Sequence, residues 1–307
     1  MDILLIAMGI ALLFTGGEAL IKGALATAQR FNVSPLLTGL VIVGFGTSAP
    51  ELAVSLDATI NGQPDIAVGN VIGSNIGNIL LILGICAVIS PLSVKPLVLK
   101  RDGTAVLLST LLFILIGGAL FSRLAGALFI VLLAAFLIYA YQTESEEPKS
   151  EEPKNIRSIG WTISVSIVGL VLLILGSQSL LKGAVNIAEH FQVSEAVIGL
   201  TLVAIGTSLP ELSISVIAAL RRHTDVAIGN VLGSNIFNLL GILGISAVVK
   251  PLSINERILQ FDQWVLLATT AVLMVFLYTG RKLSRAEASL LLLAYVTYVT
   301  LSFSKYG

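Results

Sequence analysis

The stretch that decides the fold is GLVIVGFGTSAPELAVS (39–55), which returns later in the chain as GLTLVAIGTSLPELSIS (199–215). A second stretch, DIAVGNVIGSNIGNILLILGI (65–85), returns as DVAIGNVLGSNIFNLLGILGI (225–245). Both pairs are separated by 160 residues, without a gap. Self-similarity at one fixed offset is the mark of an internal duplication, so the chain consists of two homologous halves.

The composition is that of a membrane protein. Of the 307 residues, 56% are hydrophobic and 12% are charged, whereas soluble domains carry about 25% charged residues. The net charge is zero, which argues against a nucleic-acid partner. The N-terminal MDILLIAMGI has no positively charged segment and no cleavage signal, so it predicts a first transmembrane helix and no signal peptide. We expect a multi-pass protein of the cell (inner or plasma) membrane, surrounded by the lipid bilayer, with no required protein partner.

Each half divides into five apolar segments, which predicts an all-α membrane protein of ten transmembrane helices. The first half, 1–142, has predicted helices at 2–29, 36–60, 65–90, 103–121 and 124–142. The second half, 159–307, has predicted helices at 159–189, 196–220, 225–249, 262–279 and 284–303. Between them, 143–158 is rich in Glu, Ser, Pro and Lys and lacks apolar periodicity, so it is a hydrophilic linker.

The distribution of Lys and Arg predicts the orientation in the membrane. With ten spans, the odd-numbered loops hold twelve of these residues, against four in the even-numbered loops and the tails. The odd-numbered loops and the linker are therefore expected in the cytoplasm, and both termini outside. Five is an odd number of spans, so the second half is predicted to have inverted topology relative to the first, as in many transporters.

Glu51 and Glu211 lie inside apolar predicted helices. An ionisable side chain at bilayer depth costs at least about 2.5 kcal/mol, so such residues are usually functional. The alternative is a structural ion pair with Lys22 or Lys182. Those two lysines fall near the cytoplasmic ends of their helices, where a long side chain reaches the interface, so we favour the functional interpretation.

A proline precedes each of these glutamates. Pro50 has no N–H to donate, and its ring clashes with the carbonyl of Gly46, so the helix is expected to break or kink there. The break should free backbone carbonyls near Gly44, Gly46 and Thr47, beside hydroxyls and a carboxylate. These are hard oxygen ligands, which suit Na⁺ and Ca²⁺ and not zinc or copper.

Polar residues also line one face of the next helix in each half, because residues four apart share a helix face. They are Asn70, Ser74 and Asn78, repeated as Asn230, Ser234 and Asn238. Their oxygens are candidates to complete a cation site. The alternative is that they form interhelical hydrogen bonds.

The paired G-T-S-x-P-E and G-S-N-I-x-N motifs resemble the repeats of the cation/Ca²⁺ exchanger superfamily, specifically its prokaryotic sodium/calcium exchanger branch. The resemblance covers the whole chain. It implies that Na⁺ and Ca²⁺ are transported ions, that there is no organic cofactor, and that the protein is not an enzyme. It also implies that the long first and sixth helices slide past the rest to switch access.

The resemblance implies a set of ion ligands. Glu51 and Glu211 would be the central Ca²⁺ ligands and would also hold Na⁺, with the carbonyls of Thr47 and Thr207 beside them. The remaining implied ligands are the hydroxyls of Ser48, Ser208, Ser74 and Ser234, the carbonyls of Gly44 and Ala204, and the amides of Asn78 and Asn238. Many relatives carry Asp where Asn238 stands, so the centre here has two carboxylates, and its stoichiometry and K⁺ dependence stay open.

The sequence therefore predicts a secondary antiporter that exchanges Na⁺ for Ca²⁺ by alternating access at a midplane carboxylate site. An H⁺/Ca²⁺ exchanger or a K⁺-dependent Na⁺/Ca²⁺ exchanger of the same fold remains an alternative. A cation channel fits less well, because channels usually have cyclic symmetry about an axis along the membrane normal. An intramembrane protease is weaker still, because no Ser/His or Cys/His pair lies at membrane depth.

Overall fold

A computed structural model describes residues 1–118, 120–144, 157–191 and 206–306, and these are almost entirely helical. The helices of the first half are α1 (Asp2–Phe31), α2 (Pro35–Thr38), α3 (Gly44–Thr47), α4 (Ala49–Ile60), α5 (Pro64–Gly77), α6 (Gly84–Ile89), α7 (Pro96–Val98), α8 (Thr104–Gly117) and α9 (Arg123–Glu144). Those of the second half are α10 (Ile159–His190), α13 (Leu209–Leu220), α14 (Thr224–Ile236), α15 (Leu243–Val249), α16 (Gln263–Gly280) and α17 (Arg285–Tyr306). Each predicted helical segment contains observed helix, although 196–205 lies outside the described residues.

Short π-helical segments join several of these helices. They are η1 (Gly39–Val43), η2 (Asn78–Leu83), η3 (Leu99–Gly103), η5 (Phe237–Ile242) and η6 (Ile258–Asp262). Segments η2 and η5 occupy equivalent places in the two halves, as do η3 and η6. Wider π turns of this kind are frequent at functional sites. They also make α5 and α6, and α14 and α15, continuous rods.

Two of these rods form the centre of the molecule. Of the described helices, six are long and apolar enough to cross a membrane, or seven if the bent pair Pro35–Thr47 and Ala49–Ile60 counts as one span. The most hydrophobic window of Pro64–Ile89 is 67% buried and that of Thr224–Val249 is 83% buried, against 28% for α1 and 22% for α10. The exposed apolar faces of the outer helices match a lipid surrounding. The chain is an all-α, multi-pass membrane protein.

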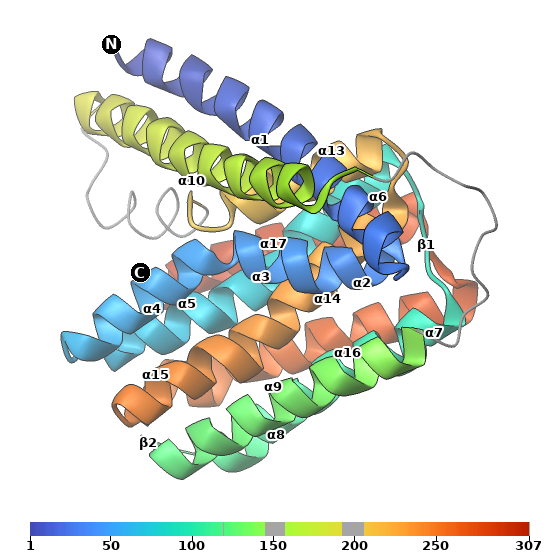
Figure 1. The fold of residues 1–307 in the computed structure, drawn as a ribbon. Helices are drawn as coiled ribbons and strands as arrows, with labels where there is room; N and C mark the ends of the chain where they lie inside the picture. The colour runs from blue at the N-terminus through green and yellow to red at the C-terminus, as the bar shows by residue number, and fades with distance from the viewer. Residues whose placement is uncertain (119, 145–156, 192–205, 307) are drawn as a thin grey trace.

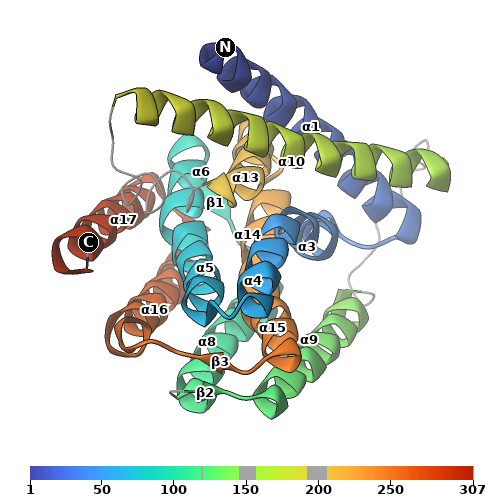
Figure 2. The ribbon, with the colours of Figure 1, turned by 90° about the vertical axis from the view of Figure 1, so that its left-hand side faces the viewer.

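The two longest helices, α1 and α10, lie side by side along one face of the bundle (Figures 1 and 2). They run antiparallel, with Gly9 against Gly176 and Gly16 against Gly169. A Cβ atom added at Gly16 would lie 2.8 Å from the carbonyl oxygen of Gly169, and one at Gly9 would lie 2.8 Å from that of Gly176. The spacing of seven residues keeps the glycines on one face, so the two backbones are in direct contact.

Two short antiparallel strand pairs connect the halves. Strand β1 (Leu92–Ser93) pairs with β4 (Lys282–Leu283), and β2 (Leu120–Phe121) pairs with β3 (Leu252–Ser253). Each pair takes one strand from each half, and the two pairs use equivalent strands with the halves exchanged. Reciprocal pairing is what a two-fold axis between two similar units produces.

Candidate cation site

The helix break predicted at Pro50 is present. Helix segments Pro35–Thr47 and Ala49–Ile60 are bent by 43°. The break lies at Ser48, with φ −79° and ψ 7°, two residues before the proline. A proline is tolerated in the first turn of a helix, where its missing N–H has no partner to lose, so the new helix begins just ahead of it. In the second half, Ser208 precedes α13 with nearly the same backbone angles, φ −89° and ψ 9°.

The two breaks bring the two glutamates together. The Ser48 hydroxyl donates to Oε1 of Glu211 over 2.9 Å, and the Ser208 hydroxyl donates to Oε1 of Glu51 over 3.0 Å. Glu51 is 0% exposed and Glu211 is 1% exposed. Motifs 160 residues apart therefore meet in one buried cluster, and each serine serves the carboxylate of the opposite half.

Among the described residues, these carboxylates have no cationic partner. Lys22 and Lys182 are exposed, and neither forms an ion pair with a glutamate in the part of the chain that the structure describes. The structural ion-pair interpretation is therefore wrong. By contrast, buried Asp102 is paired with Arg101, whose Nε lies 2.7 Å from its Oδ1.

Each glutamate also keeps one buried oxygen without a hydrogen-bond partner among the described residues, Oε2 of Glu51 and Oε2 of Glu211. The buried side-chain oxygens Oδ1 of Asn78, Oδ1 of Asn238 and Oγ1 of Thr207 also have no partner there. Native proteins rarely leave buried polar atoms without hydrogen-bond partners. We therefore expect another polar group to occupy this place. A group surrounded by carboxylate, amide and hydroxyl oxygens is most simply a hard cation.

Asn70 and Asn230 form hydrogen bonds between helices. The Nδ2 atom of Asn70 donates to the backbone carbonyl of Glu51 over 3.2 Å, and Nδ2 of Asn230 donates to that of Glu211 over 3.2 Å. Each also donates to a serine hydroxyl one turn further on, at 3.0 and 2.7 Å. The interhelical hydrogen-bond interpretation is therefore correct for these two residues, which fix the glutamate-bearing helices against α5 and α14.

The serines of α5 and α14 lie next to the breaks. The Ser74 hydroxyl lies 3.4 Å from the Ser208 hydroxyl, and the Ser234 hydroxyl donates to the Gly44 carbonyl over 3.1 Å. Thr47 is buried, and its hydroxyl donates to Oδ1 of Asn230 over 3.1 Å. All of these predicted residues belong to the same cluster.

The expectation that the break frees the Gly44 carbonyl is wrong. That carbonyl accepts from the backbone N–H of Ser48 over 3.2 Å, as well as from Ser234. The helix breaks after this bond, and the carbonyl that loses its N–H partner to Pro50 is that of Gly46. The equivalent carbonyl in the second half, that of Gly206, accepts instead from the hydroxyl of Ser177 over 2.6 Å.

The sequence did not predict two contacts of the site. Ser177 ties the long helix α10 to the second break, and no repeated motif marks it, because the equivalent residue in the first half is Gly17. Asn235 accepts at its Oδ1 from Nδ2 of Asn78 over 2.9 Å. Asn235 does belong to a repeated motif, so the repetition of G-S-N-I-x-N was the signal for it. Ala204, a predicted carbonyl ligand, lies outside the described residues.

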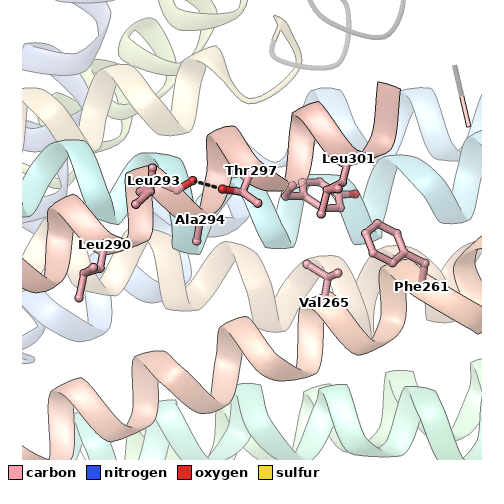
Figure 3. A pocket seen from close by; sticks show the side chains of 8 residues that line it. Phe261, Val265, Leu290, Leu293, Ala294, Thr297 and Leu301 are labelled. Atoms are coloured by element: carbon pink, nitrogen blue, oxygen red, sulfur yellow. Dashed lines mark hydrogen bonds between the residues drawn. The ribbon is translucent and has the colours of Figure 1, made fainter. Parts of the chain in front are cut away.

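An apolar groove elsewhere in the molecule is not part of this site. It has a volume of about 370 Å³ and lies between α16 and α17 (Figure 3). It is lined by Phe261, Val265, Leu290, Leu293, Ala294, Thr297, Tyr298 and Leu301. The Thr297 hydroxyl donates to the Leu293 carbonyl in its own helix over 2.9 Å. With no carboxylate or amide in its lining, the groove does not suit a cation.

The chemistry of the buried cluster is that of a site for hard cations. Its ligating groups are two carboxylates, amide oxygens, hydroxyls and carbonyls at helix ends, without thiols or imidazoles. Among the described residues, no group of three or more His, Cys, Asp or Glu side chains forms a transition-metal site. Two negative charges on a buried pair match one divalent cation.

Comparison with known proteins agrees with this geometry. The family model described as "Sodium/calcium exchanger protein" matches residues 1–142 and 161–304. The chain belongs to the sodium/calcium exchanger family. Similar proteins include one named "Putative antiporter CaxA" of Alkalimonas amylolytica, 39% identical over 97% of this chain and 98% of its own. They also include the sodium/calcium exchanger MaX1 of Methanosarcina acetivorans, 32% identical over 98% of both chains.

The exchanger fold is also matched by a solved structure. The sodium-calcium exchanger NCX_Mj, soaked with Na⁺ and Sr²⁺, superposes with a TM-score of 0.86 and 32% identity over 97% of each chain. Family and fold together make this chain a cation/Ca²⁺ antiporter. The exchanger family consists of transporters, in agreement with the expectation from the sequence.

Proposed function

We propose that the chain exchanges Na⁺ for Ca²⁺ by alternating access at a midplane site built around Glu51 and Glu211. The observation that carries the proposal is the crossed carboxylate pair, in which each Oε1 accepts from the serine of the opposite half and each Oε2 is buried without a partner in the described part of the chain. Ca²⁺ would bind between the two free carboxylate oxygens. Na⁺ ions would compete for overlapping oxygens, so that occupancy by one ion excludes the other.

The proposed ligand set follows the predicted one. Besides the glutamates it comprises the hydroxyls of Ser48, Ser208, Ser74 and Ser234, the carbonyls of Thr47, Thr207 and Ala204, and the amides of Asn78 and Asn238. The Gly44 carbonyl is left out, because it already accepts from Ser48 and Ser234. Clustering of the described members around two helix breaks supports this assignment. Broken helix at membrane depth is tolerated where it lines a cavity or lies buried in protein.

We also propose ten spans in two inverted five-helix repeats, 1–142 and 159–307, joined by a cytoplasmic linker at 143–158. The antiparallel packing of the equivalent helices α1 and α10 supports the inversion. So do the reciprocal strand pairs and the reciprocal serine–glutamate bonds. An inverted repeat with a central site is the architecture in which two similar units alternately open to the two sides.

Reconstituted protein should take up radiolabelled Ca²⁺ when proteoliposomes loaded with Na⁺ are diluted into Na⁺-free buffer. The outward Na⁺ gradient supplies the driving force, so uptake should collapse when Na⁺ is equal on both sides. Uptake that is indifferent to the Na⁺ gradient would sink the Na⁺/Ca²⁺ assignment. Repeating the assay with and without K⁺ decides K⁺ dependence, which Asn238 leaves open.

The same vesicles test the H⁺/Ca²⁺ alternative. Under that alternative, a pH gradient alone, without Na⁺, should drive Ca²⁺ uptake. We expect no such uptake, because the hydroxyls and carbonyls around each glutamate form a coordination shell that Na⁺ needs and H⁺ does not. Fluxes that saturate at slow turnover would separate an exchanger from a channel.

The proposed orientation predicts a labelling pattern. The single cysteine, Cys86, is buried, so it gives little background with a membrane-impermeant thiol reagent. In spheroplasts, Ser304→Cys at the C-terminal end should be labelled from outside. Ser150→Cys in the linker should react only after permeabilisation. The opposite pattern would reverse the proposed topology and leave the ion site untouched.

A further inference from the structure

Two buried asparagines, one on α5 and one on α14, lie outside the proposed ligand set. Asn75 and Asn235 are each 0% exposed. They occupy equivalent positions in the two halves, three residues before Asn78 and Asn238. Residues three apart lie on one side of a helix, so each of these asparagines stands one turn before a proposed amide ligand.

Asn235 joins the two halves through hydrogen bonds. Its Oδ1 accepts from Nδ2 of Asn78 over 2.9 Å, and its Nδ2 donates to the backbone carbonyl of Asn75 over 3.4 Å. Because the amide nitrogen of Asn78 is held in this way, the Asn78 oxygen is the atom left for a ligand. That oxygen is buried with no partner among the residues the structure describes, and segment η2, which begins at Asn78, packs against the Glu211 helix α13.

The equivalent contact in the other half is not made. Both side-chain polar atoms of Asn75 and both of Asn238 are buried without a hydrogen-bond partner among the described residues. Asn75 and Asn235 thus match in residue type, burial and place in the repeat. They differ in one respect, since only Asn235 holds the amide of the opposite half.

We propose that Asn235 is a positioning residue for the cation centre, which presents the Asn78 oxygen to the ion by holding the Asn78 nitrogen. This inference rests on the proposed function. Groups that orient a metal ligand without touching the metal typically change metal affinity by about 10–100-fold when removed. The same order is expected here.

The test compares Asn235→Ala with Asn75→Ala, its matched control, by calorimetric titration of the purified full-length protein with Ca²⁺ in Na⁺-free buffer. Asn235→Ala should raise the Kd for Ca²⁺ by about tenfold or more. Asn75→Ala removes a side chain that makes no hydrogen bond to any described residue, so the Kd should stay close to that of the unaltered chain. Asn235→Leu, which fills the same space with apolar atoms, serves if Asn235→Ala does not fold.

A double-mutant cycle separates positioning from general support of the fold. In an Asn78→Ala background, Asn235→Ala should cause no further rise in Kd, because its effect passes through Asn78. Equal effects of Asn235→Ala and Asn75→Ala would overturn the proposal, as would full additivity with Asn78→Ala. Absence of Ca²⁺ binding by the unaltered chain would instead overturn the proposed function itself.

Discussion

Replacing Glu51 with glutamine is expected to abolish Na⁺-driven Ca²⁺ uptake, and Glu211→Gln should do the same. Each substitution removes one of the two negative charges at the buried centre and keeps the size of the side chain. Removing one partner of a buried charge interaction costs about 3–5 kcal/mol, which corresponds to at least about a hundredfold loss of affinity. Initial rates of radiolabelled Ca²⁺ uptake in proteoliposomes measure the effect.

Thermal unfolding distinguishes this loss from misfolding. In Ca²⁺-free buffer, Glu51→Gln should melt no lower than the unaltered chain, because it removes an unpaired buried charge. Saturating Ca²⁺ should raise the melting temperature of the unaltered chain, since a ligand at a hundred times its Kd stabilises by about 2.7 kcal/mol. The variant should show no such rise. Glu189→Gln, at an exposed position of α10, is the matched control, and normal uptake by Glu51→Gln would contradict the assigned role.

The second large effect is expected from Gly233→Ala, through packing. A Cβ atom at Gly233 would overlap the carbonyl oxygen of Leu40 and lie 2.8 Å from its carbonyl carbon. These are backbone atoms, which no rotamer change can move, so α14 must shift away from η1. Overpacking costs about 1–3 kcal/mol, and a backbone clash of this kind belongs at the upper end. The melting temperature in detergent should fall, and Ca²⁺ uptake should fall with it.

The matched control is Gly160→Ala near the start of α10, where an added Cβ atom meets nothing within 4 Å. Alanine is the better helix former by about 1 kcal/mol, so this variant should melt at or above the temperature of the unaltered chain. A Gly233→Ala protein that melts together with Gly160→Ala would show that α14 and η1 are not held in the close contact described. Because Ser234 next to Gly233 bonds to the Gly44 carbonyl, the effect on uptake should extend to the centre.

Local chemistry explains what the sequence predicted well. Apolar length located the helices, and the missing N–H of Pro50 located the break to within two residues. The repeat also made it possible to expect that Glu51 and Glu211 meet. For the helices and the break, the cause lies in the residue itself or in its near neighbours, whereas the meeting of the glutamates follows from the repeat; one sequence suffices to detect both.

The features that the sequence did not predict depend on the opposite half. The Gly44 carbonyl was expected to be free, yet its partners are Ser48 and Ser234, and the latter comes from another helix. The hydrogen bond between Asn78 and Asn235, like that between Ser177 and Gly206, exists only once two helices have docked. No local preference marks the π-helical segments either, and their extra residue per turn was visible only in the structure.

The backbone contact between α1 and α10 has a mechanical consequence. At the two points where glycine lies against glycine, no side chain separates the two helices, so we expect them to move together. Through its hydrogen bond to the Gly206 carbonyl, Ser177 links α10 to the break that precedes Glu211. A displacement of that break is therefore expected to move α1 as well, although α1 itself contributes no residue to the proposed ligand set.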